Sequence, residues 1–284
     1  MAEGAHRFQV GSIQCTVLSD GYYSYPASWV FPNADPRELT GALAACHQPP
    51  DGLLSPYTCL LVETGRYVVL VDTGAGESSA TSGAILSRLA ATGIRPGDVD
   101  TVILTHAHPD HIGGAIDLCG RPTFPHARYV LSEIEWEFWT AARADLSPLR
   151  VPDSAKIDIH SMARRCLGPL RHQVEAVERE TEIVPGVAAL PAPGHTPGHL
   201  AVLIQSGGDA LLNLGDAAVH PLHLAQPSWE NGFDLAPAGA VQTRRRLLQL
   251  AAASNMHVMA FHFPFPSIGT VARAGEGWQW SPGW

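Results

Sequence analysis

The feature that most constrains this chain is a cluster of metal-ligand residues at positions 105–111, which read Thr-His-Ala-His-Pro-Asp-His. The apolar run at 100–104 before it indicates a buried strand, and a Gly-Gly pair follows it. In an extended segment, residues two apart point the same way, so His106 and His108 can face one metal ion. The candidate ligands of this stretch are His106, His108, Asp110 and His111.

A metal site explains this cluster better than chance does. A lone His-x-His pair is usually a chance surface feature, whereas several ligand-type residues packed together at a strand end favour metal binding. Pro109 ends the strand pairing, and Asp110 and His111 then turn toward a second position beside the first. Imidazole and carboxylate ligands without thiolate suit zinc, iron or manganese better than copper or an iron–sulfur cluster.

Composition limits the location and the partners. The chain has 284 residues, enough for a large core, and its net charge of -9 argues against a nucleic-acid partner, which needs a basic face. Its five cysteines form no Cys-x-x-Cys pair, which favours free thiols in a reducing compartment. The sequence shows no signal peptide and no run as long as a transmembrane helix. We therefore expect a cytoplasmic protein with no nucleic-acid or membrane partner.

Hydrophobic periodicity and turn residues alternate strands with helices along the chain. Strands are expected within 8–18, 57–63, 67–71, 100–104, 128–131, 181–190, 200–205, 210–214 and 256–261, and helices at 36–46, 80–92, 133–144 and 237–252. The aromatic stretch 22–32 is expected to be a lid, a dimer arm or a loop packed on the core, and the arginines at 244–246 a solvated helix face. Two halves of strands and helices favour a layered α/β or α+β domain.

Three more candidate ligands follow predicted strands in the second half of the chain: His195, Asp216 and His262. Strand ends and the loops after them are where sites are commonly built. Singly, each residue has an ordinary explanation, since Gly-Asp after a strand is usually a turn and a late histidine often belongs to the core. Their order along the chain, together with the cluster at 105–111, is far more specific than any single piece.

Taken in order, these motifs resemble those of the metallo-β-lactamase superfamily. The matching pieces are Asp72-Thr-Gly74, His106-x-His108-x-Asp110-His111, Gly194-His195-Thr-Pro-Gly-His199, Gly215-Asp216 and His262. The resemblance implies a four-layer αββα sandwich, in which two mixed sheets face each other with helices outside and metals at one edge. It also implies a single domain over residues 1–284, with residues 1–50 as an N-terminal extension of strands and an aromatic arm.

The same resemblance implies a role for each ligand residue. His106, His108 and His195 would hold a first divalent metal, Asp110, His111 and His262 a second, and Asp216 would bridge both. Asp72 would orient a ligand histidine, and His199 would stay outside the set that touches metal. The implied ions are two zinc ions, although manganese, iron and cobalt also suit these ligands. A hydroxide bridging the ions would attack the substrate, and Asp110 would pass the proton.

A closer resemblance is to the subgroup that holds methyl parathion hydrolase and the N-acyl homoserine lactone lactonases. It rests on the aromatic N-terminal arm, the helix at 135–139, the residues after Asp216 and the segment His262-Phe-Pro-Phe-Pro266. It implies hydrolysis of a small apolar lactone, ester or phosphotriester, and a homodimer formed through the arm. One departure is Val219, where several lactonases carry a tyrosine.

The substrate pocket is expected to be apolar. The candidates for its wall are Phe31, Trp136, Trp139, Trp229 and Phe233, each of which is as well explained by the core or the surface. Two other functions stay open. One is a thioesterase similar to hydroxyacylglutathione hydrolase, which would need cations to bind the carboxylates of glutathione, and Lys156 is the sole lysine. The other is a non-catalytic metal-binding or sensing module on the same fold.

Overall fold

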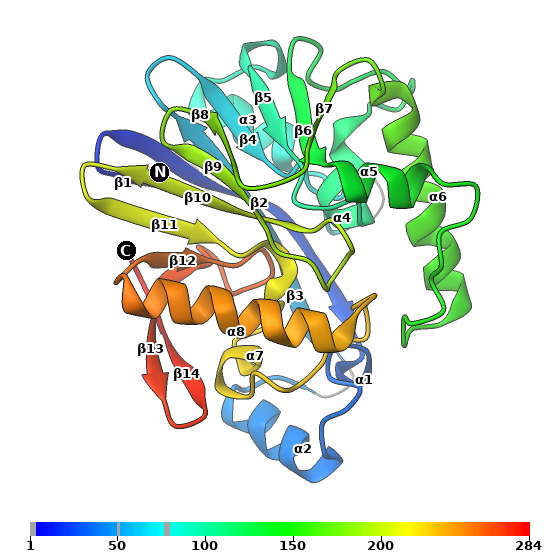
Figure 1. Cartoon of the computed structure of the whole chain (residues 1–284), viewed down its shortest axis with the longest axis vertical. Helices are drawn as coiled ribbons and strands as arrows, with labels where there is room; N and C mark the ends of the chain where they lie inside the picture. Colours follow the sequence, from blue (N-terminus) through cyan, green and yellow to red (C-terminus); the bar gives the residue numbers. More distant parts are fainter. Residues whose placement is uncertain (1–3, 50–51, 77–79) are drawn as a thin grey trace.

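Two seven-stranded sheets lie face to face in the computed structural model, which describes residues 4–49, 52–76 and 80–284 (Figure 1). The first sheet contains, in spatial order, β1 (Ala5–Val10), β2 (Ile13–Tyr25), β3 (Leu53–Glu63), β4 (Val68–Val71), β5 (Thr101–Ile103), β6 (Arg128–Ser132) and β7 (Val174–Val177). The second contains, in spatial order, β14 (Gly277–Pro282), β13 (Ile268–Ala274), β12 (His257–Met259), β11 (Asp209–Asn213), β10 (Leu200–Ser206), β9 (Val187–Pro191) and β8 (Thr181–Val184).

The helices connect the strands and cover the outer faces of the sheets. They are α1 (Ala27–Val30), α2 (Pro36–Ala45), α3 (Ile85–Thr92), α4 (Pro109–Ile112), α5 (Glu133–Thr140), α6 (Asp153–Leu170), α7 (Leu222–Ala225) and α8 (Pro237–Ala253), with short 3₁₀ turns η2 (Pro96–Asp98), η3 (Gly113–Ala115) and η4 (Gly215–Ala217). Parallel neighbours need a crossover, which α3 provides between β4 and β5 and α8 between β11 and β12. Within the described ranges, no helix combines the length and the apolar character needed to cross a membrane.

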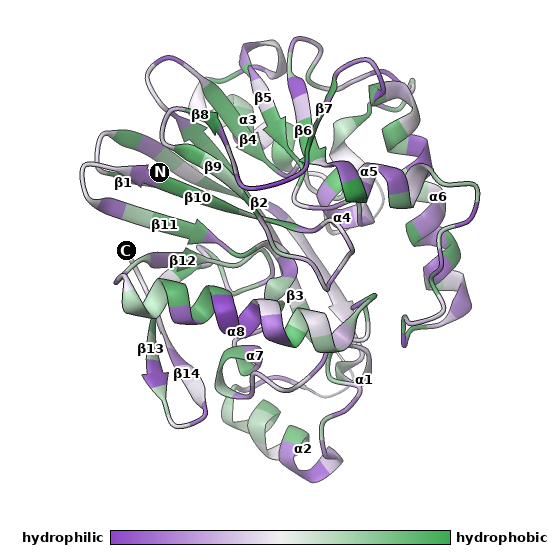
Figure 2. Cartoon of the chain, viewed as in Figure 1, coloured by the Kyte–Doolittle hydropathy of each residue, from purple (hydrophilic) through white to green (hydrophobic). Residues whose placement is uncertain are grey.

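The central strands are apolar on both faces, which produces four layers. In β3, Cys59 and Leu61 pack in the cluster that includes α3, α5 and α6, whereas Leu60 and Val62 pack against the second sheet. Residues of β10 alternate in the same way between the first sheet and α8. Figure 2 shows apolar residues along these strands and a mixture of apolar and hydrophilic residues along α8. The αββα sandwich expected from the sequence is confirmed.

The aromatic stretch 22–32 becomes the end of β2 and the short helix α1. α1, α2 and α7 pack around a separate apolar cluster that includes Phe31, Leu43 and Trp229. The carboxylate of Asp35 accepts hydrogen bonds from two backbone N–H groups in the first turn of α2, as expected of an N-cap. This end of the molecule therefore has its own small core, beside the edge at which the metal-ligand residues lie.

Two predicted boundaries were wrong. The last strand was expected at 256–261, but β13 and β14 follow β12 and form a hairpin at the edge of the second sheet. Arg273 and Glu276 interrupt the apolar pattern of this hairpin, so the sequence does not indicate its strands. The structure shows them, with Trp278 buried in the apolar cluster on the outer face of the second sheet. The helix expected at 80–92 begins at Ile85, because the Asp20 carboxylate accepts the N–H of Ile85 and holds the first turn at that point.

The arginine run at 244–246 does not form a uniformly solvated face, contrary to expectation. Arg244 is buried because the helical period places it on the same stripe of α8 as Ala240 and Leu248. Its guanidinium donates to the backbone carbonyls of Ala217 at 2.7 Å, Pro227 at 3.1 Å and Trp229 at 2.6 Å. Burial lowers the pKa of Arg244 to about 10, so the side chain remains charged at neutral pH.

Replacing Arg244 by alanine should lower the free energy of unfolding by about 2–4 kcal/mol, because three carbonyls lose their donor and a void remains. Arg245 is the matched control: it lies next on α8 and makes no side-chain hydrogen bond within the described part of the chain. Arg245→Ala should change stability by less than about 0.5 kcal/mol. Urea unfolding followed by circular dichroism measures both, and equal losses would contradict this role for Arg244.

Candidate metal centre

Loops that follow strands of both sheets converge at one edge of the sandwich. Asp72 follows β4, the segment 105–111 follows β5, His195 lies between β9 and β10, Asp216 lies in η4 after β11, and His262 follows β12. The pairs β4–β5 and β11–β12 are parallel, so within each pair the polar loops leave the sheet at the same end. Side chains far apart in the sequence therefore meet in one place.

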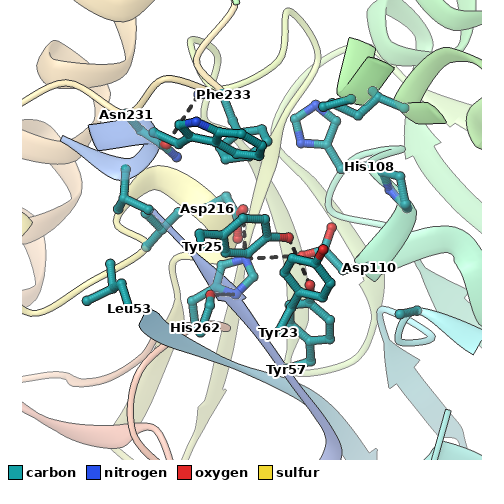
Figure 3. Close-up of a pocket in the computed structure, with 18 of the residues that line it drawn as sticks. Tyr23, Tyr25, Leu53, Tyr57, His108, Asp110, Asp216, Asn231, Phe233 and His262 are labelled. Atoms are coloured by element: carbon teal, nitrogen blue, oxygen red, sulfur yellow. Dashed lines mark hydrogen bonds and ion pairs between the residues drawn. The ribbon is translucent and has the colours of Figure 1, made fainter. Parts of the chain in front are cut away.

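The structure gathers the side chains that the sequence analysis named as ligands into three overlapping groups. They are His106, His108 and His195; His106, His111 and Asp216; and Asp110, His111 and His262, with the ligand atoms of each group within 4.8 Å of one another. Asp216 lies between the two outer groups: its Oδ2 is 3.3 Å from Nε2 of His195 and 3.2 Å from Nε2 of His262. One carboxylate therefore reaches both halves of the cluster (Figure 3).

Hydrogen bonds made by Nδ1, the ring nitrogen that faces away from the cluster, fix the ring orientation of three of these histidines. His111 Nδ1 donates to Asp72 Oδ2 at 2.9 Å, and His195 Nδ1 donates to Asp234 Oδ1 at 2.9 Å. His262 Nδ1 lies 3.0 Å from the carbonyl of Pro56. Carboxylate and carbonyl oxygens only accept, so each Nδ1 carries a proton and each ring presents its Nε2 to the cluster.

Asp72 is itself held in an unusual backbone conformation. Its φ of 61° is left-handed, a region that residues other than glycine rarely adopt and that functional sites often contain. In this position its Oδ1 accepts the backbone N–H of Thr105 at 2.8 Å while its Oδ2 binds His111. One carboxylate thus fixes both the start of the 105–111 loop and the ring of one of its histidines.

Several buried atoms of the cluster have no hydrogen-bond partner among the described residues. They include Nε2 of His106, Nε2 of His111 and Oδ1 of Asp216. In addition, Nδ1 of His108 and Nε2 of His195 face each other at 2.9 Å. Leaving a buried polar atom unsatisfied costs about 1–3 kcal/mol, so such a group of atoms calls for a ligand. Imidazole nitrogens and carboxylate oxygens in this arrangement fit divalent metal ions such as zinc.

The electrostatics of the cluster favour metal binding. Burial lowers the pKa of His106 and His108 well below the ordinary value, and neighbouring histidines lower it further, so both rings are neutral at pH 7. Burial alone would raise the pKa of Asp216, but His262 and His111 outweigh it and hold the pKa well below the usual range. Burial would lower the pKa of His111 and of His262, but neighbouring carboxylates, Asp216 first, outweigh it and raise both. A metal ion would therefore displace a proton from these two rings, whereas the neutral imidazoles and the ionised carboxylate are already in the state that binds a metal.

The buried carboxylate of Glu135 ties the two ligand-bearing loops together, and the sequence analysis did not identify it. Its Oε1 accepts the N–H of Ala107 at 3.0 Å and the indole N–H of Trp139 at 2.7 Å. Its Oε2 accepts the hydroxyl of Thr196 at 2.7 Å and the N–H of Gly198 at 3.0 Å. Burial raises the pKa of Glu135, and these donors oppose the rise. The helical pattern of α5 assigns no special role to this position.

The ring of His199 positions Asp216 by binding the backbone N–H of Asp216. Its Nδ1 donates to the carbonyl of Ala192 at 3.0 Å, and its Nε2 accepts the N–H of Asp216 at 2.9 Å. Burial lowers the pKa of His199 to about 3, which keeps the ring neutral for this pair of bonds. Both ring nitrogens are therefore occupied, and His199 belongs to none of the three ligand groups.

A cavity of about 380 Å³ opens beside the cluster (Figure 3). Its wall includes ligand residues together with aromatic side chains from β2, α1, β3 and the loop before α8: Tyr23, Tyr25, Trp29, Tyr57 and Phe233. Among the described residues that line it there is no lysine and no arginine, and the charged side chains there are Asp110, Asp158 and Asp216. The cavity therefore suits an uncharged, largely apolar ligand.

Of the five aromatic residues expected at the pocket wall, the structure places Phe233 there. Phe31 and Trp229 instead pack against each other in the apolar cluster behind the wall, with ring centroids 5.5 Å apart. Trp139 is fully buried, edge-on to His108, and Trp136 packs on the same core. The helical period of α5 and the small core around α1 turn these rings away from the cavity. Their places at the wall are taken by Tyr23, Tyr25 and Trp29.

Comparisons with known proteins agree with this geometry. A family profile described as the metallo-beta-lactamase superfamily matches residues 53–255. An N-acyl homoserine lactonase of Bacillus thuringiensis is 28% identical over 218 residues, which cover 69% of this chain and 76% of that protein. The structure of AidC, described as a dizinc quorum-quenching lactonase with a bound product, is similar with a TM-score of 0.92 and 26% identity over 99% of this chain and 97% of that one. The hydrolase AbOPH gives a TM-score of 0.89 and 26% identity over 99% and 98%.

Replacing Glu135 by glutamine should lower the free energy of unfolding by about 2–4 kcal/mol, because the amide nitrogen would face two of the four donors that now bind the carboxylate. Glu137→Gln is the matched control on the exposed face of α5 and should change stability by less than about 0.5 kcal/mol. Guanidinium unfolding monitored by tryptophan fluorescence measures both. A Glu135→Gln variant as stable as the control would refute the role of this carboxylate.

Proposed function

This chain belongs to the metallo-beta-lactamase superfamily and is a metal-dependent hydrolase, and we propose that it opens lactones at a dinuclear zinc centre. The observation that carries the proposal is the position of the ligand cluster in the wall of a largely apolar cavity whose described lining contains no lysine and no arginine. The relatives named above, a lactonase in sequence and a dizinc lactonase in structure, support the same chemistry.

In this proposal two metal ions would share seven protein ligands. His106, His108 and His195 would hold one ion, and Asp110, His111 and His262 would hold the other. Asp216, which lies between these two groups, would serve both. Asp72 and Asp234 act through the histidines by fixing the ring orientation of His111 and His195. When bound, the two ions polarise the ester carbonyl and supply hydroxide as a nucleophile at neutral pH.

Asp110 is the residue placed to move a proton. It lines the cavity, its side chain is 15% exposed, and its Oδ2 lies 3.3 Å from Nε2 of His262. A carboxylate at the border between the ligand cluster and the cavity can receive the proton released during attack and deliver it to the alcohol oxygen that leaves as the ring opens. The side chain is thus both a ligand and the acid that completes the reaction.

The shape and the charge of the cavity favour an uncharged ester over the alternatives. Its volume of about 380 Å³ lies within the range of small-molecule sites. Phe233 packs edge-on against Tyr25 with centroids 5.4 Å apart, and such rings can hold an acyl chain. A glutathione thioester carries carboxylates, which the described wall offers no cation to bind. A phosphotriester is uncharged and is therefore the second candidate.

Initial rates on a small panel test the substrate class: an acyl homoserine lactone, a simple aliphatic lactone, a dialkyl aryl phosphotriester and a glutathione thioester. We expect kcat/KM for one of the lactones to exceed that for the thioester by at least about 10²-fold, because the described wall offers no lysine or arginine to bind the carboxylates of the thioester. Phosphotriester cleavage faster than either lactone would contradict the proposal and favour the second candidate.

Asp216→Ala should leave less than two equivalents of metal and lower kcat/KM on the best substrate by at least about 10²-fold, because the ligand shared by both ions is lost. Asp158→Asn is the matched control, since Asp158 lies on the wall of the same cavity but in none of the ligand groups. It should retain both ions. Metal content by elemental analysis and rates measured on the same samples check both variants, and two tightly bound ions in Asp216→Ala would refute the bridge.

A further inference from the structure

We infer that the hydroxyl pair of Tyr25 and Tyr57 is a substrate-binding element, in which Tyr25 donates a hydrogen bond to the carbonyl oxygen of the substrate. This assignment rests on the proposed hydrolysis of lactones at the same site. The two phenol oxygens lie 2.9 Å apart, and both side chains line the cavity together with Asp110 and Asp216. Figure 3 shows the two hydroxyls directed toward each other next to these carboxylates.

The two phenols together have one more O–H proton than the hydrogen bond between them uses. Each phenol carries one proton, and the hydrogen bond between the two oxygens uses one of them. Neither oxygen has another hydrogen-bond partner among the described residues. One O–H therefore has no acceptor among the described residues and lies on the cavity wall, where it can donate to a ligand. A ligand oxygen that enters the cavity supplies the missing acceptor.

The packing of the two rings indicates which proton is free. Tyr57 is only 3% exposed and is wedged between Phe261, at a centroid distance of 5.9 Å, and the edge of His262, at 5.5 Å. Because Tyr57 is buried and Tyr25 is only partly buried, the proton of Tyr57 goes to the oxygen of Tyr25. Tyr25 then keeps its own proton for the cavity. A hydroxyl that accepts one hydrogen bond becomes a stronger donor of the next, so Tyr57 also strengthens Tyr25.

The pair is preorganised. The Tyr25 ring packs edge-on against Phe233 at a centroid distance of 5.4 Å and lies 4.8 Å from the Tyr23 ring. A rigid donor helps most where charge develops during the reaction, and the carbonyl oxygen of an ester gains negative charge when a nucleophile adds to it.

In this assignment β2 and β3 supply a hydrogen-bond donor for the substrate as well as part of the cavity wall. Val219, which follows Asp216 closely and also lines the cavity, has no side-chain donor. The two phenols come from β2 and β3 instead, two strands that the sequence places before the metal-ligand motifs. An ester or lactone in the cavity would meet both the metal-ligand residues and the Tyr25 hydroxyl, since both line it.

Four variants test the assignment: Tyr25→Phe, Tyr57→Phe, the double variant, and Tyr22→Phe as the matched control. Tyr22 lies on the same strand as Tyr25, is 45% exposed, and is not among the described residues that line the cavity. We expect kcat/KM for the preferred lactone to fall about 10–100-fold in Tyr25→Phe, and less in Tyr57→Phe. The double variant should be no worse than Tyr25→Phe, and Tyr22→Phe should stay within about twofold of the parent.

A second readout separates this assignment from the proposed function. Calorimetry measures the Kd of a γ-lactam analogue, which keeps the carbonyl oxygen but resists hydrolysis, on samples that carry equal metal. We expect Kd to rise at least about threefold in Tyr25→Phe and to stay unchanged in Tyr22→Phe. If the parent protein opens no lactone yet shows this pattern with the lactam, the proposed function fails and the hydroxyl assignment stands.

Two results would overturn the assignment. One is a Tyr25→Phe variant that matches the parent protein in both lactone turnover and lactam binding. The other is a greater loss in Tyr57→Phe than in Tyr25→Phe, which would reverse the order of the two donors. A parent protein that neither opens a lactone nor binds the lactam would refute the assignment together with the proposed function.

Discussion

Buried carboxylates that bind backbone N–H groups and imidazoles are the interaction on which the site depends. Asp72, Glu135 and Asp234 are each almost completely buried, and each fixes a ligand histidine or the loop that carries it. Removing a charged carboxylate from water is unfavourable unless several donors converge on it. Because these donors lie on loops from different strands, the site assembles only when both sheets and the helices between them are in place.

The two sheets contribute differently to the centre. The first sheet provides the histidines that follow β5, and the second provides His195, Asp216 and His262. The apolar layer between the sheets, with Leu60 and Val202 at its centre, sets their separation and therefore the spacing of ligands from opposite sides. Packing in the interior of the sandwich is thus coupled directly to the geometry of the metal cluster at its edge.

The grouping of the candidate ligand residues at one edge follows from motifs visible in the sequence, whereas the lining of the cavity beside them does not. Residues such as His106 and His108 are close in sequence at a strand end, so their chemistry is visible without a fold. Glu135 and Asp234 are single acidic residues in ordinary contexts, and their partners are backbone N–H groups and rings remote in sequence. Phe31 and Trp136 carry the same apolar signal as Trp29, and only packing decides which ring faces the cavity.

By itself the sequence determined the alternation of apolar strands and helices and the order of the ligand motifs. Both follow from local chemistry: the period of two or 3.6 residues in a buried element, and the metal affinity of clustered imidazoles and carboxylates. Tertiary structure decided that Arg244 is buried, that Glu135 joins two loops, and that the hydroxyls of Tyr25 and Tyr57 meet at the cavity. Such contacts join distant segments, and no local pattern encodes them, because they depend on how the two sheets pack.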